Sequence, residues 1–342
     1  MTDKPVSRLL MLCALTLSLV LNVHHLLFDG FNPWRIDFHV FWQAASRDAS
    51  ELYISSNAPF VYPPTAIVFF KPLALLDFAT GYLVWTILSA SLFAIIVTRQ
   101  LGWRVALLSF FSAAALQGLV LGQTPMLLSA ALLFAIALPG FACGVIFGVV
   151  AAIKPQILML APLAFIVRKD WRSLAGMVVG LLGCIAVELA LYGPQLWLDW
   201  INSIPAFRQS LFRTNVTEKV ITPYGSADHL GINPIPFLAV SAALAVAALI
   251  VLAKRIEGIY LVAAIIGASI LASPYALLHD TIALVPASIA FIIAHPRLKA
   301  LPAIGIFSGC LVGVSLVVAA ALQFMTRRKV SRDSKPRAQA AR

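Results

Sequence analysis

Residues 234–253 read PIPFLAVSAALAVAALIVLA and contain no Asp, Glu, Lys or Arg. A helix needs roughly 20 mostly apolar residues to cross the hydrocarbon core of a bilayer, so this stretch is long enough to span one. Three further stretches, 9–28, 78–98 and 301–325, also lack acidic and basic residues. The sequence therefore predicts a multi-pass membrane protein.

The overall composition excludes a soluble domain. Of the 342 residues, 61% are hydrophobic and 11% are charged, and the mean hydropathy is +0.93. A soluble domain has about 45–50% apolar and about 25% charged residues. We therefore expect residues 1–325 to form one all-α transmembrane bundle of about 10–11 spans. Besides the four stretches above, spans are expected near 65–98, 105–121, 124–138, 140–153, 155–167, 171–192, 258–273 and 275–294.

Two apolar stretches allow more than one interpretation. Residues 9–28 follow a basic N-terminus, as in a secretory signal peptide. The run is longer than the usual ~7–15 residues and no small-x-small cleavage site follows it, so we expect a retained first helix. Pro72 must bend or break the stretch 65–98. This leaves either one kinked span or a short interfacial helix followed by a span.

Basic residues gather in short turns and in the tail. The formal net charge is +11, and the tail 326–342 contributes seven Lys or Arg and one acid. Other basic residues cluster near 99–104, 168–172, 254–255 and 297–299. This pattern is typical of helix orientation by positive charge and of a disordered tail attracted to anionic lipid headgroups. It argues against a nucleic-acid partner.

The same charges predict which side of the membrane each segment faces. The positive-inside rule places the basic turns in the cytoplasm. It places two larger polar segments, about 29–64 and 193–233, on the extracytoplasmic side of the cell (inner) membrane. Simple alternation of the expected spans, however, puts the basic tail outside, in conflict with that rule.

The four cysteines lie inside apolar stretches, and none has CxxC spacing. A buried cysteine behaves as a small hydrophobic residue. We therefore predict neither a disulfide nor a metal site.

Polar residues beside or inside apolar stretches are the candidate functional residues, because burying them in a membrane is costly. Asp37 follows Arg35 just after the first helix, and 37–47 reads as an amphipathic helix on the membrane surface. Asp37 is then either the N-cap of that helix or a reactive carboxylate. Tyr62-Pro63-Pro64 begins the next apolar stretch, where Tyr62 is either an interfacial anchor or one wall of a sugar pocket.

Two further candidates lie between short apolar runs. Gln123, in Gly122-Gln123-Thr124-Pro125, marks a plain turn or hydrogen-bonds a hydroxyl or phosphate oxygen of a substrate. Lys154-Pro155-Gln156 interrupts 140–167, where Pro155 breaks the helix and its freed backbone should line a cavity rather than face lipid. Lys154 suits the phosphate of an anionic headgroup. The short runs on either side indicate a bent hairpin of half-length helices.

An adjacent His279 and Asp280 follow Ser273-Pro274-Tyr275. They pair with each other or with Glu188, or form a buried structural network. On the expected topology these features form a polar basin at the outer edge of the membrane, which suits a substrate with a lipid tail in the bilayer and a polar head in water. The basin comprises Asp37, Gln123, Lys154, His279 and Glu188.

The order of these motifs resembles glycosyltransferase family 87, the polyprenol-phosphate-mannose-dependent mannosyltransferases of the GT-C fold. The resemblance extends from Asp37 to about residue 293 and is carried by Asp37, Tyr62-Pro63-Pro64, Gly122-Gln123 and Lys154-Pro155-Gln156. It implies an outward-facing site, a lipid-phosphate sugar donor, and Asp37 as general base. The sequence departs from the pattern in its short second outer segment and in having His279-Asp280 where a Tyr-Asp pair is expected.

The residues fit transfer of a hexose, mannose by the resemblance, from a polyprenyl-phosphate co-substrate to a hydroxyl of a lipid or glycan acceptor. A carboxylate can take the acceptor proton, and a base on the face opposite the phosphate gives inversion. Lys154, with Arg35, would stabilise the phosphate charge, and the scheme requires no metal or other cofactor. The remaining expected substrate-binding residues are Tyr62, Gln123, Gln156, His279 and Asp280.

Two other function classes are open from the sequence. A transporter or flippase for a lipid-linked or small anionic solute would have inverted repeats and discontinuous helices near the midplane. The broken helix at Lys154-Pro155 fits that class in part, whereas the long, asymmetric outer segments do not. A non-catalytic membrane scaffold leaves Lys154 and His279-Asp280 unexplained.

Overall fold

The computed structural model describes residues 37–53, 60–213 and 220–294. Within these ranges the chain forms fourteen α-helices and no strand, so the predicted all-α membrane bundle is confirmed. Arg35, the apolar stretches 9–28 and 301–325, and the tail 326–342 lie outside the described residues.

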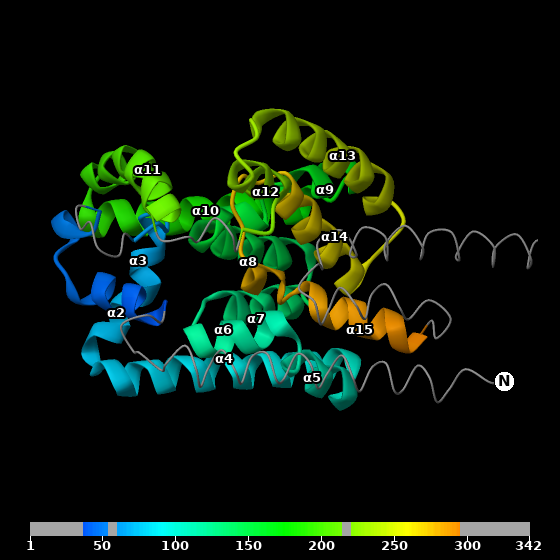
Figure 1. The fold of residues 1–342 in the computed structure, drawn as a ribbon. Coiled ribbons are helices and arrows are strands. Elements are labelled where there is room, and N and C mark those ends of the chain that lie inside the picture. Colours follow the sequence, from blue (N-terminus) through cyan, green and yellow to red (C-terminus); the bar gives the residue numbers. More distant parts are fainter. Residues whose placement is uncertain (1–36, 54–59, 214–219, 295–342) are drawn as a thin grey trace, which may run out of the picture.

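The described helices run in chain order between two ends of the molecule (Figure 1). They are α2 (Phe38–Ser46), η2 (Ala49–Glu51), α3 (Thr65–Phe70), η3 (Lys71–Leu75), α4 (Phe78–Leu101), α5 (Trp103–Phe110), α6 (Ala113–Leu121), α7 (Pro125–Ala135), α8 (Gly140–Ile153), η4 (Pro155–Ile157), α9 (Ala161–Arg168), α10 (Trp171–Tyr192), α11 (Gln195–Arg213), α12 (Pro223–His229), α13 (Ile235–Ala253), α14 (Gly258–Leu271), η6 (Leu278–Thr281) and α15 (Leu284–Ala294).

Three described helices, α4, α10 and α13, are long and apolar enough to cross a membrane. The pair α5 and α6 makes a fourth candidate if its 66° bend is counted within one span. Several other apolar stretches form helices of 10–17 residues. The expectation of about 10–11 spans therefore corresponds, in the described part of the chain, to a few full-length helices and many short ones.

The stretch 65–98 is a short helix followed by a span. After η3, Leu76 is extended, and α4 begins behind Asp77, whose carboxylate accepts a hydrogen bond from the Thr80 N–H at 3.0 Å. This is an N-cap, which satisfies one of the free amides at a helix start. Gly102, at φ 88°, ends the helix at its other terminus. The alternative of one kinked span is thereby excluded.

Two expected spans differ from the structure. The stretch 105–121 is broken because Ser112 leaves the helical conformation and its hydroxyl accepts the Ala115 N–H, which starts a new helix, α6. The stretch 275–294 becomes α-helical only at Leu284. There the Asp280 carboxylate accepts the Leu277 N–H at 2.9 Å and holds the chain in the short helix η6 instead.

Glycines bring α8 and α10 into backbone contact. A Cβ added at Gly144 would collide with the Ser173 carbonyl oxygen, and one at Gly148 with the Met177 carbonyl oxygen. Small residues at four-residue spacing allow such close approach in membrane helices. Because later residues of α8 contact later residues of α10, the two helices run in the same direction.

The segment α8–η4–α9 therefore forms a hairpin. Its second arm returns α9 to the end where α8 began, since the Arg168 guanidinium donates to the carbonyl oxygens of Ala253 and Ile256 at 2.6 and 2.9 Å. Lys154 lies at the turn between the arms, as predicted from Pro155. The Thr65 hydroxyl donates to the Ala152 carbonyl and ties this turn to α3.

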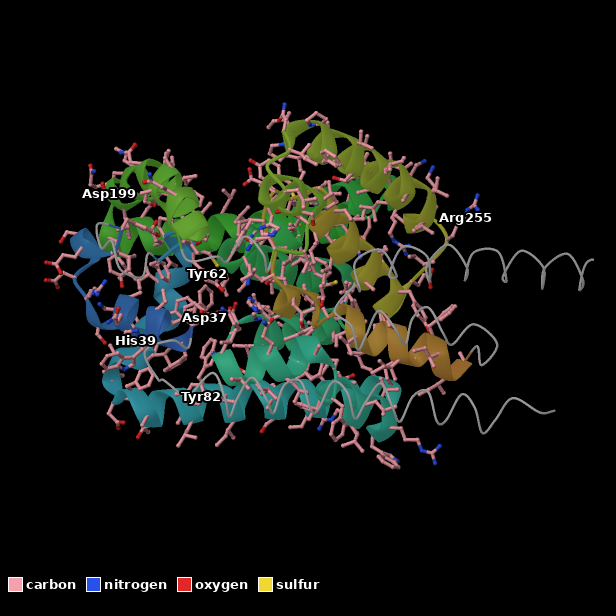
Figure 2. All side chains as sticks on the ribbon, viewed as in Figure 1. Asp37, His39, Tyr62, Tyr82, Asp199 and Arg255 are labelled. Atoms are coloured by element: carbon pink, nitrogen blue, oxygen red, sulfur yellow. The ribbon has the colours of Figure 1, made fainter. Side chains whose placement is uncertain are left out.

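The two predicted polar segments meet at one end of the bundle. The Trp200 indole N–H donates to the Val61 carbonyl at 3.3 Å, which joins the second segment to the first. The second segment is not a plain loop but contains α11 and α12. Figure 2 shows Asp37, Tyr62 and Asp199 toward this end and Arg255 at the opposite end.

Candidate functional site

Asp37 is mounted on a helix packed by aromatic rings. The Phe38 ring lies 5.8 Å from that of Phe78 and 5.6 Å from that of Tyr82, and the Phe41 ring stacks on Phe70 at 4.5 Å. The expected amphipathic helix is thus present as α2, with its apolar face buried in the protein. Such aromatic pairs favour defined geometries, so the start of α2 is held in a fixed position.

The Asp37 carboxylate does not cap α2. No side-chain cap hydrogen bond is made at this helix start. Instead, the carboxylate oxygen Oδ2 accepts a hydrogen bond from the Gln123 side-chain amide, Nε2. The N-cap interpretation is therefore wrong, and Asp37 faces the junction of α6 and α7.

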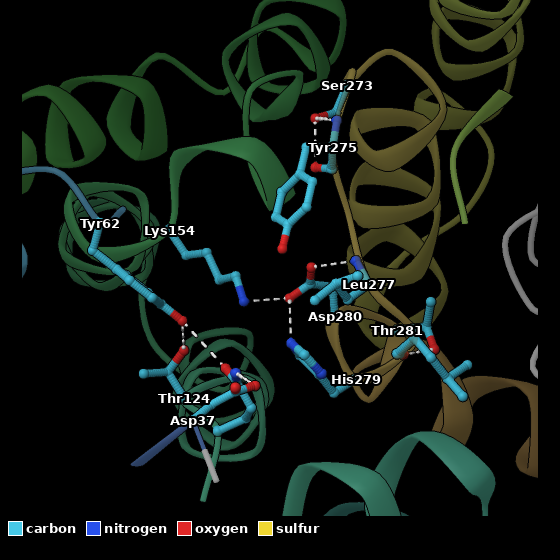
Figure 3. Close-up of polar contacts among 12 residues, drawn as sticks. Asp37, Tyr62, Thr124, Lys154, Ser273, Tyr275, Leu277, His279, Asp280 and Thr281 are labelled. Carbon is cyan, nitrogen blue, oxygen red and sulfur yellow. Dashed lines mark hydrogen bonds and ion pairs between the residues drawn. The ribbon is translucent and has the colours of Figure 1, made fainter. Parts of the chain in front are cut away.

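Gln123 is placed by a tight turn between α6 and α7. Gly122 adopts a left-handed conformation, φ 64° and ψ 35°, and ends α6. A Cβ at this position would lie 2.7 Å from the Phe38 Cβ, so only glycine lets the turn approach α2. The turn thus brings a buried Gln123 directly against Asp37 (Figure 3).

Tyr62 links this turn to the α8–α9 hairpin. Its hydroxyl donates to the Gln123 oxygen Oε1 at 3.3 Å and lies 3.0 Å from the Thr124 hydroxyl oxygen. Its ring lies 5.5 Å from the Lys154 ammonium, within the range of a cation–π contact. With only 8% of its surface exposed, Tyr62 belongs to the interior and does not act as an interfacial anchor.

Lys154 is paired with an acid from the far part of the chain. Its Nζ lies 2.5 Å from the Asp280 oxygen Oδ1, and the two side chains are 5% and 1% exposed. The His279 nitrogen Nε2 lies 3.9 Å from the same Asp280 oxygen. A buried charge is tolerated only with a partner, so each of these two residues keeps the other inside the protein.

These contacts define one polar cluster: Asp37, Tyr62, Gln123, Thr124, Lys154, His279 and Asp280 (Figure 3). Its members come from four separate parts of the chain, at the ends of α6 and α8, the start of α2 and the short helix η6. The cluster offers a carboxylate at one side and a paired ammonium at the other. Such an arrangement can move a proton and hold an anion.

Residues 60–278, more than half of the chain, match glycosyltransferase family 87. The chain belongs to glycosyltransferase family 87. A search of curated proteins and a search of solved structures each returned no match. This member of family 87 is a membrane glycosyltransferase, so the choice between an enzyme and a transporter falls to the enzyme.

The family 87 match contains some cluster residues and ends beside others. Tyr62, Gln123 and Lys154 lie inside the matched range, whereas Asp37 precedes it and His279-Asp280 directly follow it. The structure nevertheless brings all of them together. The cluster is therefore larger than the part of the chain that the family match covers.

Two of the predicted basin residues lie outside the cluster. The Glu188 oxygen Oε2 accepts the Trp197 indole N–H at 2.5 Å, so Glu188 ties α10 to α11 and is not the partner of His279-Asp280. Its position one turn before the end of α10 puts it beside α11 rather than beside η6. Gln156 is partly exposed in η4 and takes no part in the cluster contacts.

Tyr275 is a site residue that the sequence did not single out for a role. Its phenol interacts electrostatically with Asp280, Asp37 and Tyr62, and Figure 3 shows it pointing into the cluster. Its ring also lies 5.7 Å from that of Phe207 in α11. The Ser273-Pro274-Tyr275 motif was the available signal, since Ser273 accepts the Tyr275 N–H at 3.2 Å and fixes this turn.

Electrostatics around the mount of Asp37 favour neutral neighbours. Burial lowers the pKa of the His39 imidazole, and Arg47 lowers it further. Burial likewise raises the pKa of the Tyr53 phenol, which donates to the Tyr62 carbonyl at 2.8 Å. At neutral pH these two side chains therefore add no charge beside the cluster.

A separate cavity of about 380 Å³ lies at the other end of the bundle. It is lined by Trp103, Arg104, the preceding end of α4 and the end of α15. It shares no residue with the cluster, so it is not part of the site.

Proposed function

We propose that this family 87 enzyme transfers a hexose, mannose, from a polyprenyl-phosphate donor to a hydroxyl of a lipid or glycan acceptor, with inversion at the anomeric carbon. The observation that carries the proposal is the meeting of Asp37 with Lys154 in one polar cluster, through Gln123 and Tyr62. A base and an anion-binding cation on opposite sides of a small space match the two ends of this reaction.

In the proposed step, the acceptor oxygen attacks the anomeric carbon while its proton passes to the Asp37 carboxylate. The bond from the anomeric carbon to the phosphate oxygen breaks, and its electron pair leaves with the phosphate. General base catalysis of this kind contributes typically 10²–10⁴-fold. Attack from the face opposite the phosphate inverts the anomeric centre.

Lys154 is the proposed contact for the donor phosphate. An ammonium carries three N–H donors, so Lys154 can bind Asp280 and a phosphate oxygen at the same time. Asp280 keeps the ammonium in a buried position, and the Tyr62 ring covers one side of it. Tyr62, Gln123, His279, Asp280 and, outside the described residues, Arg35 complete the proposed donor side; Gln156 is proposed to contact donor from the hairpin turn.

The extracytoplasmic position of the site is a proposal that rests on charge. The cluster lies at the end where the two polar segments meet, and basic turns with Arg168 and Arg255 lie at the other end. By the positive-inside rule the basic end faces the cytoplasm. The site then opens to the outer face of the cell (inner) membrane, where lipid-linked donors can present their sugars.

The mannosyl and polyprenyl identities of the donor rest on the resemblance of the motifs to family 87. The membrane setting supports a lipid-linked substrate, because a donor tail can lie in the bilayer beside the bundle while its head enters the cluster.

The experiment that tests the base assignment compares Asp37→Asn with the control Asp48→Asn. Asp48 lies in the same polar segment but is exposed and makes no side-chain cap contact. Membranes containing each variant are supplied with radiolabelled polyprenyl-phosphate mannose. We expect transfer to fall about 10²–10⁴-fold in Asp37→Asn and to be unchanged in Asp48→Asn. Full activity of Asp37→Asn would remove the residue from the base role.

Sidedness is tested by placing single cysteines at Asp48 and at Arg255. A membrane-impermeant thiol reagent should label the first in right-side-out vesicles and the second in inverted vesicles, with the parent chain as background control. Labelling of Arg255→Cys from the outside would contradict the proposed orientation.

A further inference from the structure

Gln123 uses both polar ends of its side chain on protein groups. Its amide nitrogen donates to the Asp37 oxygen Oδ2, and its oxygen accepts from the Tyr62 hydroxyl at 3.3 Å. A side-chain amide has a donor end and an acceptor end. An ionised carboxylate only accepts, so Asp37 fixes which end of the amide faces it.

The backbone around Gln123 is equally constrained. Its own N–H donates to the Gly118 carbonyl at 2.9 Å, behind the left-handed Gly122. Pro125, at the first turn of α7, follows directly after Thr124, whose hydroxyl lies 3.0 Å from that of Tyr62. Gln123 itself is 7% exposed. The amide therefore approaches Asp37 from one fixed direction.

We propose that Gln123 is a positioning residue that holds the Asp37 carboxylate ionised and correctly aimed, with Tyr62 and Thr124 fixing the amide. This rests on the proposed role of Asp37 as base. It assigns Gln123 to the orientation of the base rather than to a substrate hydroxyl or phosphate oxygen.

The physical consequence concerns the protonation of Asp37. A hydrogen bond donated to a carboxylate favours its charged form, so loss of the amide makes the base easier to protonate. The other titratable groups facing Asp37 include Tyr275, before η6, and Tyr82 of α4, which donates to the carbonyls of Leu119 and Val120. Tyrosines titrate near pH 10 or above, so they do not contribute to an acidic limb.

The test replaces Gln123 by Met, which keeps the length of the side chain and removes both polar ends. Transfer of mannose from radiolabelled polyprenyl-phosphate mannose is measured in membranes between pH 5 and pH 8. We expect kcat to fall about 10- to 100-fold, with the donor KM nearly unchanged. The acidic limb of kcat/KM should move to higher pH by about one unit.

Two companion variants keep the outcome interpretable. Tyr62→Phe removes only the hydroxyl that orients the amide, so it should move the same limb in the same direction by a smaller amount. Gln100→Met is the matched control, because Gln100 also donates from its side-chain amide, to the Leu133 carbonyl. It lies at the other end of α4, and its pH profile should equal that of the parent chain.

A raised donor KM with an unmoved acidic limb in Gln123→Met would overturn the proposal and make Gln123 a substrate-binding residue. The same unmoved limb beside an inactive Asp37→Asn would overturn it while leaving the base assignment intact. An active Asp37→Asn would remove the base assignment and this proposal together.

Discussion

The buried pair Lys154–Asp280 gives the sharpest prediction about stability. The Lys154 Nζ and the Asp280 Oδ1 are 2.5 Å apart, and both side chains are almost fully buried. Removing one member of such a pair leaves an uncompensated buried charge, which costs about 3–5 kcal/mol. Lys154→Met and Asp280→Asn should therefore each lower the thermal unfolding midpoint strongly in detergent micelles.

The double variant Lys154→Met/Asp280→Asn carries neither charge. Its cost should be smaller than the sum of the two single costs, because the penalty for an unpaired charge disappears. The interaction energy of the double-mutant cycle should reach about 3 kcal/mol, the upper end of the range for residues in direct contact. Sugar transfer should stay low in the double variant, since the proposed phosphate contact is absent.

Lys71→Met serves as control, because the Lys71 ammonium binds the Arg47 carbonyl at 3.2 Å in an exposed position. Surface substitutions of this kind change stability little. Strictly additive costs of the two site substitutions would refute the reasoning, since they would mean that neither charge depends on the other. Recovery of full transfer by the double variant would refute the phosphate role of Lys154.

Further predictions concern the helix contact and the mount of Asp37. Gly144→Ala should lower the unfolding midpoint markedly, because its Cβ would strike the Ser173 carbonyl, whereas Gly183→Ala in α10 meets open space and should be neutral or slightly stabilising; equal midpoints would contradict the close packing. His39 has a pKa below its ordinary value of 6.5, so the unfolded chain binds its proton more readily. Stability from neutral His39 is complete above about pH 6.5 and is lost as pH falls below it. Unfolding midpoints from pH 7.5 to pH 5 should fall less steeply in His39→Gln than in the parent, and parallel curves would exclude the effect.

Bulk hydrophobicity and proline positions predict much of this fold. The long apolar runs became α4, α10 and α13, and Pro155 marked the turn of the hairpin. These signals are local, because a helix and its break depend on neighbouring residues. The break at Ser112 and the delayed start of α15 were missed, since a hydroxyl or carboxylate that caps a backbone amide outweighs continuous hydrophobicity there.

The site was predictable in membership but not in pairing. Asp37, Gln123, Lys154 and His279-Asp280 were conspicuous because polar residues are rare in this sequence. Which of them meet depends on how α2 packs against the α6–α7 turn and how the hairpin packs on η6. Glu188 shows the limit, because a nearby indole N–H from α11 captured a carboxylate that could have joined the basin.

The position of Lys154 at the turn of the hairpin has a consequence for biosynthesis. The ribosome delivers Lys154 well before Asp280, so the newly made hairpin carries an ammonium whose counter-charge does not yet exist. The hairpin cannot bury that turn stably until η6 emerges and docks. A chain that stops short of η6 should therefore leave the hairpin exposed to quality-control proteases, and completion of the catalytic cluster becomes one of the last steps of assembly.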